Sequence, residues 1–416
     1  MLSYNKFRLL NIIMETVFYR YNPWWNNSLI LPDIIPRKNL VERLKVDLGT
    51  KDILFLTGLR RIGKTTLMKL LIESLINGKK VPHKNIFYIS LDDYQLSKLS
   101  ILEIIEEYRR IQQIPFREKI YVFLDEVTSK DDFEIQLKNI YDSGYIKVIA
   151  SSSSTTLLKS KKPYLTGRNK LVEILPLDFE EYLQFKEITI LPEDRALKQK
   201  YFEEYLSIGG IPEYVLRGDV EYLKEVIDDI LYKDIISHYK VEDINILKDY
   251  FSLLMERAGK VVSTNKISKI LEISPDTSNR YLKMFEDSYL IYKVSRFGKT
   301  NETIRAAKKI YAADTGIKTF STGFRDLGSL FENYVYLQIR DKKPRYVYKD
   351  GNEIDFMTQD KILIEVKYGR EIEGKQKELF DKYKSKDKIV IRNIFELEDF
   401  LNKINVFKIN KTESNR

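Results

Sequence analysis

The chain has 416 residues, of which 43% are hydrophobic and 31% are charged, and its formal net charge is +9. This length predicts two to four domains, and this composition is typical of a soluble globular protein. Because the sequence contains no cysteine, disulfides, thiolate zinc sites and cysteine nucleophiles are excluded. The sequence has just two histidines, His83 and His238, which makes imidazole metal sites and Ser-His-Asp triads unfavoured expectations. Hydrolytic chemistry is therefore expected to use carboxylates, lysine and bound metal.

The modest positive charge favours an anionic partner. Nucleic acid is favoured over a membrane surface, because no expected helix is both strongly basic and strongly amphipathic. Lys6, Arg8 and Glu15 interrupt the short apolar stretch at the N-terminus, so no signal peptide is expected. No apolar run approaches the roughly 18 residues that a membrane-spanning helix needs. We therefore expect a cytoplasmic protein with no membrane partner.

The N-terminal 50 residues contain an amphipathic helix, followed by YNPWW and a turn-rich stretch. From residue 52 to 175, apolar runs alternate with helical patterns, which predicts a parallel α/β sheet. The expected strands are residues 52–57, 85–91, 119–124, 146–151 and 171–175, and the main helices between them are residues 64–78, 100–113 and 131–142.

The rest of the chain changes pattern twice. Residues 176–240 are expected to be helical, with a break at GGIP, and residues 245–311 to form three helices and a short hairpin. From residue 327 onward a helix, strands and another helix predict a small α/β module.

The strongest motif is GLRRIGKTT at residues 58–66, which matches GxxxxGK[ST] between an apolar strand and a helix. Its glycines allow the backbone N–H groups to surround phosphates at a helix N-terminus. Lys64 is expected to reach the β- and γ-phosphates of ATP, and the Thr65 hydroxyl to bind Mg²⁺. The alternative is a chance match in an ordinary strand–turn–helix. The expected nucleotide contacts are Gly58, Arg60, Arg61, Gly63, Lys64, Thr65, Thr66 and Ser152.

Two acids, Asp125 and Glu126, end the strand KIYVFL, at the sheet edge where ligands gather. Asp125 is expected to hold the magnesium, and Glu126 to orient and activate the attacking water. Adjacent acids imply a strand between the two motif strands, which gives the sheet order 5-1-4-3-2. The fourth strand ends in four serines, residues 151–154, where Ser152 is the candidate sensor of the γ-phosphate. A plain serine-rich loop is the alternative there.

Together with LTGR at 165–168 and PLDFEEYL at 176–183, these motifs resemble an archaeal and bacterial family of AAA+-superfamily ATPases. The resemblance extends from YNPWW to about residue 370. It implies a P-loop module followed by a winged helix and a nuclease-like domain. That family usually has Gly or Thr before the serines, where this chain has Ala150 and Ser151. By resemblance alone, Pro36 and Arg37 border the adenine.

We expect five segments: an N-terminal extension at 1–37, a P-loop ATPase core at 38–176, a helical lid at 177–240, a winged helix at 241–311, and a small restriction-endonuclease-like α/β domain at 312–416. Arg168 of LTGR is the candidate arginine that stabilises transition-state charge, on its own or a neighbouring nucleotide. A structural salt bridge is the alternative for Arg168. Its action on a neighbour would need an oligomer, which the sequence neither shows nor excludes.

Residues 261–294 have the pattern of a helix-turn-helix, with Ser274 as the cap and Pro275 as the first residue of the second helix. Residues on the outer side of that helix suit a DNA groove, although the domain can instead be a lid or linker. Basic residues around the following hairpin suit phosphate contacts, with only Glu302 opposing them. The expected DNA contacts are Asn279, Arg280, Lys283, Arg296 and Lys299, and the other basic residues of the hairpin region are Lys293, Arg305, Lys308 and Lys309.

The C-terminal module carries an acid on a helix, Glu332, then GNEIDFM, then ILIEVKYG, in the order of a PD-(D/E)xK nuclease. Alternation along the second strand places Glu365 and Lys367 on one face. Asp355 and Glu365 are expected to hold Mg²⁺ or Mn²⁺, and Lys367 to position or deprotonate water. A degenerate site that binds without cutting is the alternative. Glu353 lies in the first motif strand, and Gln376 and Phe380 are candidate supporting residues.

The sequence therefore predicts a multidomain ATPase that couples ATP hydrolysis, with release of ADP, to DNA binding or processing. Metal-dependent DNA cleavage is a further possibility. One alternative is an ATP-dependent regulatory switch, for transcription or of a toxin–antitoxin kind, with a C-terminal domain that only binds. The other is a remodeller of protein partners, in which case the basic surface is incidental.

Overall fold

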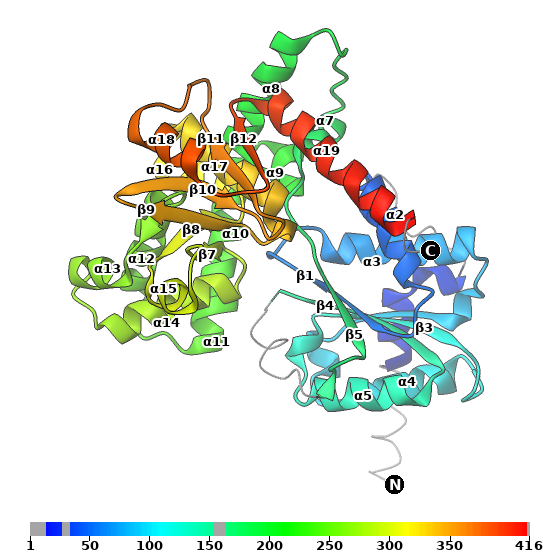
Figure 1. Ribbon diagram of the computed structural model, residues 1–416. Coiled ribbons are helices and arrows are strands. Elements are labelled where there is room, and N and C mark those ends of the chain that lie inside the picture. The colour runs from blue at the N-terminus through cyan, green and yellow to red at the C-terminus, as the bar shows by residue number, and fades with distance from the viewer. Residues whose placement is uncertain (1–13, 27–33, 154–163, 414–416) are drawn as a thin grey trace. The chain divides into compact units, whose positions relative to one another are not determined.

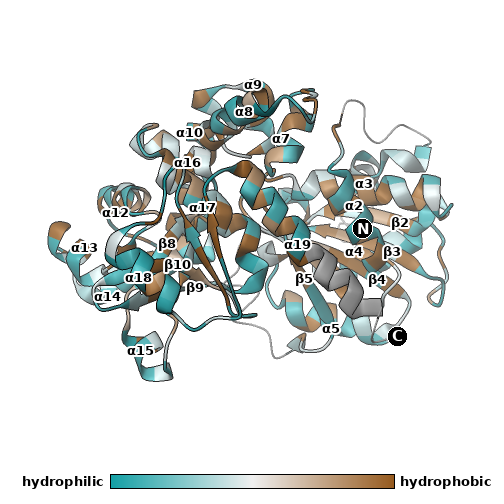
Figure 2. Cartoon of the chain, turned by 45° about the horizontal axis from the view of Figure 1, so that its top comes forward, coloured by the Kyte–Doolittle hydropathy of each residue, from teal (hydrophilic) through white to brown (hydrophobic). Residues whose placement is uncertain are grey.

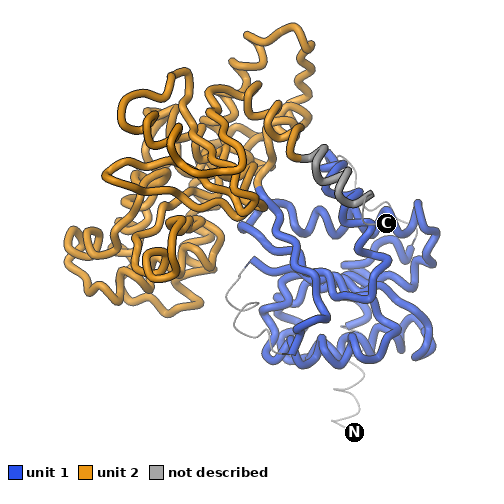
Figure 3. The backbone as a smooth tube through the Cα atoms, viewed as in Figure 1, with its two compact units in different colours: residues 1–175 blue, residues 176–416 orange. Residues whose placement is uncertain are grey.

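A computed structural model describes residues 14–26, 34–153 and 164–413 of the chain (Figure 1). The chain divides into two compact units, Met1–Leu175 and Pro176–Arg416 (Figure 3). The finer boundaries at residues 37, 240 and 311 stay predictions. Hydrophobic residues are concentrated on the central strands of the sheets (Figure 2). In the described part of the chain, no helix is long and apolar enough to cross a membrane.

Unit 1 contains a five-stranded sheet in which every neighbouring pair is parallel. The order β2-β3-β4-β1-β5 confirms the predicted order, read from the other edge. The same register places the carboxyl ends of β2, β3, β4 and β1 at one edge of the sheet. The strands are β1 (Ile53–Thr57), β2 (Ile86–Ser90), β3 (Ile120–Asp125), β4 (Ile146–Ser152) and β5 (Asn169–Glu173).

Helices cover both faces of this sheet, with α2 and α3 on one side and α4 and α5 on the other (Figure 1). Side chains that alternate along the strands pack on α4 and α5 in one core, because successive strand residues face opposite ways. Phe87 and Tyr108 stack in it with ring centroids 4.4 Å apart. The helices are α2 (Lys38–Asp47), α3 (Lys64–Glu73) with a π-helical continuation (Ser74–Gly78), α4 (Ile101–Ile111) and α5 (Phe133–Ser143).

The motif YNPWW lies along the edge strand β2. The Asn22 side chain accepts a hydrogen bond from Tyr88 N at 2.7 Å and donates one to Tyr88 O at 2.9 Å. The indoles of Trp24 and Trp25 both donate to Ile86 O, at 3.2 and 3.0 Å. The segment therefore satisfies backbone groups that an edge strand leaves open. Residues 1–13 and 27–33 of the predicted N-terminal extension lie outside the described residues.

Unit 2 begins with helices, as predicted, and the break at GGIP has a packing cause. A Cβ at Gly209 would lie 2.2 Å from Asp314 Oδ1, and one at Gly210 would lie 2.2 Å from Leu177 O. Only glycine allows these close approaches. The helices are α7 (Phe179–Phe185), α8 (Arg195–Ile208), α9 (Pro212–Arg217) and α10 (Val220–Asp229), which continues through a π-helix (Ile230–Ile236) into α11 (Ser237–Tyr239).

The next segment contains the three expected helices and a small antiparallel sheet in the order β6-β8-β7. Ser274 caps the third helix by accepting from Thr277 N at 3.0 Å, and Pro275 is its first residue, as predicted. The short helix α15 in the hairpin loop was not predicted. The elements are α12 (Ile244–Glu256), β6 (Val261–Val262), α13 (Thr264–Ile270), α14 (Pro275–Asp287), β7 (Ile291–Val294), α15 (Thr300–Arg305) and β8 (Lys308–Ala312).

The C-terminal part is an α/β module around a four-stranded sheet in the order β12-β11-β10-β9. Strands β11 and β12 are parallel, whereas β10 is antiparallel to both of its neighbours. Helix α17 packs against β11 and also against β8 of the smaller sheet. The elements are α16 (Thr315–Thr322), α17 (Leu327–Ile339), β9 (Arg345–Lys349), β10 (Asn352–Met357), β11 (Ile362–Val366), α18 (Gly374–Lys382), β12 (Asp387–Ile391) and α19 (Ile394–Glu413).

Candidate functional site

The loop between β1 and α3 has the backbone that its glycines predict. Gly58 has φ +137°, and a Cβ there would lie 2.3 Å from Ile174 O, so no larger residue fits beside the neighbouring strand. Gly63 has φ +92° and directly precedes α3. With Arg61 also at positive φ, the loop curves back before the helix begins. The N–H groups at the start of α3 therefore form the end of this loop, which is the backbone form that binds phosphate.

Lys64, the first residue of α3, is buried within its own loop. Its Nζ donates to Gly58 O at 3.1 Å and to Leu59 O at 3.0 Å. Around it, Arg60 and Thr66 are half-buried and Arg61 is exposed. The loop thus holds a buried ammonium group on its inner side, where phosphate oxygens would replace carbonyl oxygens as acceptors.

The carboxylate of Asp125, at the end of β3, accepts hydrogen bonds from three hydroxyl groups on three different elements. Thr65 Oγ1 of α3 donates to Asp125 Oδ2 at 2.6 Å, and Tyr88 Oη of β2 donates to the same oxygen at 2.8 Å. Ser151 Oγ of β4 donates to Oδ1. β3 lies between β2 and β4, so the sheet order explains this convergence. Burial and the charge of Asp125 raise the pKa of Tyr88 far above its usual value, so Tyr88 stays a hydroxyl donor.

The pair Thr65 and Asp125 suits a magnesium ion. One hydroxyl oxygen and one carboxylate oxygen lie together at the end of the loop, and such hard oxygen donors are what Mg²⁺ prefers. The structure brings together both residues that the sequence assigned to this metal, and the assignment stays a prediction. Tyr88 was missed, and its only sequence signal was its place near the end of the strand that neighbours KIYVFL.

Glu126 follows Asp125 in the left-handed backbone region, with φ +50°. Its N–H donates to Ser151 Oγ at 3.0 Å, and its Oε2 accepts from the N and Oγ of Ser153, both at 3.4 Å. These contacts turn the half-buried carboxylate toward the serine-rich end of β4. Ser152 Oγ lies 3.0 Å from Thr128 Oγ1. The serine that contacts Asp125 is therefore Ser151, and the sensor role of Ser152 stays a prediction. Ser154 lies outside the described residues.

Arg168 lies at the opposite edge of the sheet from the loop. Its carbonyl accepts from Ile53 N at 2.9 Å, and Asn169 pairs with Ile53, so Arg168 lies where β1 begins rather than where it ends. Its Nε contacts Asp142 Oδ1 at 3.3 Å. The structure therefore does not bring Arg168 to the loop of its own chain, and the salt bridge that was the alternative is present. Action on a neighbouring nucleotide stays a prediction.

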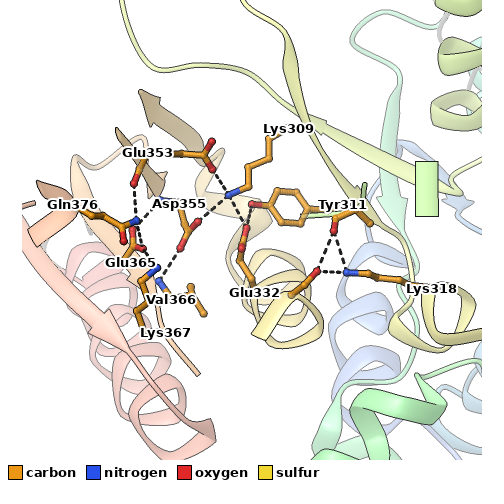
Figure 4. A network of polar contacts seen from close by, with 12 residues as sticks. Lys309, Tyr311, Lys318, Glu332, Glu353, Asp355, Glu365, Val366, Lys367 and Gln376 are labelled. Atoms are coloured by element: carbon orange, nitrogen blue, oxygen red, sulfur yellow. Dashed lines mark hydrogen bonds and ion pairs between the residues drawn. The ribbon is translucent and has the colours of Figure 1, made fainter. Parts of the chain in front are cut away.

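A second polar cluster lies in unit 2 and joins four acids to two lysines (Figure 4). Asp355 of β10 and Glu365 of β11 are buried. They are linked through the backbone, because Val366 N donates to Asp355 Oδ2 at 2.9 Å and Asp355 N donates to Glu365 Oε2 at 3.2 Å. We call this set the carboxylate–lysine cluster; its members are Lys309, Glu332, Glu353, Asp355, Glu365 and Lys367.

The predicted partners of Glu365 are in place. Lys367 Nζ lies 2.9 Å from Glu365 Oε1, as alternation along β11 predicted. Gln376 of α18 donates to the same oxygen at 2.7 Å. Burial and the nearby charge of Asp355 raise the pKa of Glu365 well above its ordinary value. Phe380 packs instead in the hydrophobic core of the module, with Val347 and Ile354.

Lys309 of β8 occupies the centre of the other three acids. Its Nζ lies 2.8 Å from Glu332 Oε1, 2.6 Å from Glu353 Oε1 and 2.8 Å from Asp355 Oδ1. The side chain is 2% exposed. Burial alone would lower the pKa of Lys309, but Asp355 and Glu332 outweigh it and hold the pKa well above its normal value. A permanent cation from the smaller sheet therefore neutralises these carboxylates.

This contact corrects the expectation that Lys309 belongs to an exposed basic surface. Lys293 also differs, since its Nζ lies 2.6 Å from Glu286 Oε2, and Lys308 Nζ donates to Thr303 O at 2.7 Å. Arg296 donates to Tyr348 O at 2.6 Å, so it links the hairpin to β9. These hairpin cations are used inside the unit: Lys293 and Lys308 contact groups that are near in sequence, whereas Arg296 and Lys309 contact groups on strands that are distant in sequence.

The cluster does not suit a metal ion as its side chains stand. Carboxylates are good ligands for Mg²⁺ or Mn²⁺, but an ammonium group already lies within hydrogen-bond distance of three of them. Among the described residues, no three acids or histidines are arranged to hold a metal ion. The expected metal ligands Asp355 and Glu365 are thus close together, but the ammonium of Lys309 already lies 2.8 Å from Asp355 Oδ1 and would compete with a metal there.

The expected DNA contacts of α14 lie on its outer side. Asn279, Arg280 and Lys283 are all exposed, while Tyr281, Leu282 and Phe285 are buried, which matches the predicted faces of the helix. Lys299 is exposed at the start of α15. Three exposed polar or basic side chains on one helix face are the arrangement that contact with a nucleic-acid groove needs.

The sequence matches known families over most of its length. Residues 50–183 match the family described as AAA domain. Residues 199–327 match a domain of unknown function, DUF8612, and residues 327–411 match another, DUF4143. The first match covers the loop, the strand acids and the parallel sheet, so the chain carries an AAA-type P-loop ATPase domain.

Relatives of similar length occur in archaea and bacteria. An uncharacterized protein of Methanocaldococcus jannaschii is 29% identical, over 83% of this chain and 82% of its own length. One of Haemophilus influenzae is 25% identical, over 79% of this chain and 86% of its own length. Among solved structures, the ORC1 protein of Aeropyrum pernix in complex with DNA is 13% identical, over 72% of this chain and 95% of that chain, with a TM-score of 0.33. So distant a structural likeness carries no argument about function.

Proposed function

We propose that the chain binds ATP with magnesium at the loop of unit 1, hydrolyses it, and couples this turnover to DNA bound by unit 2. The observation that carries the proposal is the contact of Thr65 Oγ1 with Asp125 Oδ2 at 2.6 Å, at the end of a loop that ends in a buried lysine. This contact joins the two halves of a nucleotide site, the phosphate loop and the strand acid, in one place.

Each residue of the site has a role that follows from its position. Lys64 leaves the carbonyls of Gly58 and Leu59 to hold phosphate oxygens, and Thr65 with Asp125 holds the metal. Bound magnesium neutralises charge on the phosphates. Glu126, turned toward the end of β4 by Ser153, orients the attacking water and accepts its proton. Tyr88 and Ser151 keep Asp125 in place through hydrogen bonds from uncharged hydroxyl groups.

DNA is the proposed partner of unit 2. The exposed side chains of Asn279, Arg280 and Lys283 on α14, with Lys299 of α15, support a winged-helix mode of binding. Phosphate contacts of this kind are sequence-independent and weaken steeply with salt. Repositioning of these residues during ATP turnover would couple the two activities. A steep salt dependence of DNA binding would count against a remodeller of protein partners.

The carboxylate–lysine cluster bears on whether the C-terminal module cleaves DNA or binds without cutting. Metal-dependent cleavage through Asp355, Glu365 and Lys367 requires that a metal replace the ammonium of Lys309. The close contacts of Lys309 favour the second candidate function, an ATP-dependent regulatory switch whose C-terminal module binds without cutting. A buried cation that pairs with three acids stabilises the fold without a metal, which suits a module that has a structural or binding role.

One experiment compares the two. Wild type, Lys64→Ala and Asp355→Ala are incubated with linear and supercoiled DNA, with Mg²⁺ or Mn²⁺, with and without ATP, while phosphate release and DNA cleavage are followed together. Lys79→Ala, an exposed lysine beyond the far end of α3, is the matched control. Phosphate release that disappears in Lys64→Ala and persists in Lys79→Ala supports the ATPase. Equal release in both variants would overturn it.

The DNA arm decides between the two candidates. Cleavage that requires Asp355 and responds to ATP through Lys64 assigns an ATP-coupled nuclease. Intact DNA under every condition, with phosphate release unimpaired, assigns the regulatory switch.

A further inference from the structure

A pocket of about 600 Å³ opens in unit 2 where three segments meet. Its walls are the turn at 259–260, the stretch 324–329 at the start of α17, and the residues that follow β11, 366–370. Glu332 and Lys367 line it too, so the pocket reaches the carboxylate–lysine cluster from the solvent side. The cluster itself is nearly closed, because Lys309 and Glu365 are buried.

The lining carries an excess of available positive charge. Lys260, Arg325 and Arg370 are exposed around the pocket. Within the described part of the chain, none of these three makes an ion pair. The two acids of the lining are already engaged: Asp326 accepts from Ser329 N at 3.0 Å, and Glu332 contacts Lys309. Three cations therefore remain to attract an anionic ligand.

A further buried cation lies behind the wall. Lys318 of α16 is 5% exposed, and its ammonium donates to Ala258 O at 3.0 Å and to Ser329 Oγ (Figure 4). Ser329 lines the pocket, so this charge lies one side chain away from it. Burial lowers the pKa of Lys318 to about 8, so near neutral pH the side chain still carries its charge for most of the time. The low-dielectric wall strengthens the field that this charge exerts on an anion in the pocket.

The pocket also exposes an aromatic ring. Phe324 lines the pocket and is 47% exposed, although it is a large apolar side chain. Tyr368 also lines the pocket, and its hydroxyl donates to Glu203 Oε1 at 2.7 Å. Free cations together with an accessible aromatic face are the combination that binds unpaired nucleotides, since phosphates meet the cations and bases stack on the ring.

We infer that this pocket binds a segment of single-stranded nucleic acid, with phosphates at Lys260, Arg325 and Arg370 and one base on Phe324. The inference rests on the proposed function of unit 2 in binding nucleic acid, but it assigns an unpaired strand to a place separate from α14. A volume of about 600 Å³ takes one nucleotide and not a duplex. The base must be unpaired to reach the ring.

The test measures binding of a fluorescent 12-mer of thymidine by anisotropy, with EDTA and without ATP, so that neither hydrolysis nor cleavage contributes. The charge-reversing double variant Arg325→Glu/Arg370→Glu is expected to bind at least about tenfold more weakly at moderate salt, since two phosphate contacts are lost. Lys382→Glu/Lys384→Glu, which reverses two exposed charges outside the pocket, is expected to change affinity less than about twofold.

Phe324→Ala separates stacking from charge. It is expected to weaken binding of the thymidine 12-mer roughly fivefold or more. The same variant is expected to bind a 12-mer of abasic sites with unchanged affinity, because that strand has phosphates but no bases. A uridine 12-mer in parallel distinguishes a DNA partner from an RNA partner of the same chemistry. Arg280→Ala/Lys283→Ala is expected to weaken duplex binding and leave the thymidine 12-mer unchanged, which separates this pocket from the proposed winged helix.

Three results would overturn the inference: no binding of the thymidine 12-mer by wild type, equal binding by Arg325→Glu/Arg370→Glu, or equally strong competition by a polyglutamate peptide. The last would assign the pocket to an acidic protein segment. Loss of ATP hydrolysis or of duplex binding leaves these readouts unchanged, so failure of the proposed function is distinguishable.

Discussion

The two polar sites of this chain hold their central aspartates in opposite ways. Among the described residues, the side chain of Asp125 in unit 1 accepts hydrogen bonds from the hydroxyl groups of Thr65, Tyr88 and Ser151. Asp355 in unit 2 forms an ion pair with the ammonium of Lys309 and accepts a hydrogen bond from the N–H of Val366. Hydroxyls satisfy hydrogen bonds but leave the negative charge, so Asp125 can take a cation. An ammonium neutralises the charge within the fold, so an external cation must compete with it.

The first arrangement suits a site where ligands exchange, whereas the second suits a permanent internal ion pair. Thr65 and Asp125 lie at the end of a loop, where ligand and metal can enter and leave. Lys309 and Asp355 are both buried, and the lysine comes from a strand of another sheet. A buried pair of this kind is costly to break, because the remaining charge is left without a partner.

The largest expected effect comes from a matched pair of variants. Asp125→Asn is expected to lower Mg²⁺-dependent ATP hydrolysis about a hundredfold or more, because the amide removes the charge that holds the metal. Asp355→Asn is expected to leave hydrolysis within about twofold. Phosphate release at saturating ATP measures both. Comparable losses in the two variants would contradict the separation of the sites.

Lys309→Met tests whether the ammonium takes the place of a metal. Loss of the central cation is expected to destabilise unit 2 by about 3–5 kcal/mol, since three acids are left uncompensated. Mn²⁺ is expected to restore part of this stability in the variant and little in wild type. The control is Lys308→Met on the same strand, whose ammonium contacts only a carbonyl in the described structure. If Mn²⁺ shifts the thermal unfolding of all three proteins equally, the ammonium of Lys309 does not take the place of a metal.

Asp314 shows a third way of stabilising a buried carboxylate, since its hydrogen-bond donors in the described part of the chain are backbone N–H groups. It accepts from Gly210 N at 2.7 Å and Ile317 N at 3.0 Å, and burial raises its pKa to about 6. An unfolded Asp has a pKa near 4, so between about pH 4 and 6 the folded state binds more protons. The contribution of Asp314 to unfolding free energy is therefore greatest below that window and falls by on the order of 2–3 kcal/mol as pH rises through it.

Hydrogen exchange of unit 2 peptides in a urea series, at pH 4.5 and 7.5 and corrected for chemical exchange, measures this change. Amides at 209–211 and 314–318 are the most informative. Stability that rises with pH there would show that the Asp314 carboxylate is better held than its burial implies.

The smallest expected effect is that of Tyr88→Phe. It removes one neutral donor from Asp125, which is expected to cost about 1–2 kcal/mol of unfolding free energy and to change ATP hydrolysis less than tenfold. Urea unfolding followed by the tryptophans reports on unit 1, since Trp24 and Trp25 both hydrogen-bond to its edge strand. A loss of hydrolysis as large as that of Asp125→Asn would mean that Tyr88 acts in the reaction itself.

The nucleotide site could be predicted in most of its parts because its signals are local. The loop GLRRIGKTT is continuous in sequence, and Asp125 and Glu126 end a strand whose apolar run is unmistakable. The order of the parallel strands followed from the adjacent acids, and the structure confirms it. The pairing of Glu365 with Lys367 followed in the same way from alternation along one strand.

Contacts between distant segments had no such signal. Lys309 precedes Asp355 by 46 residues and was one of several hairpin cations, yet packing of β8 beside α17 and β10 buries it among three acids. Tyr88, Arg168 and the pocket at 259–260 and 324–329 are likewise defined by which strand or loop lies beside another.

Sequence by itself thus determined the phosphate loop, the strand acids and the order of the first sheet, because periodicity and motif spacing are properties of neighbouring residues. Tertiary structure decided which carboxylates keep an open charge and which are neutralised, because that depends on the side chain that packing brings to them.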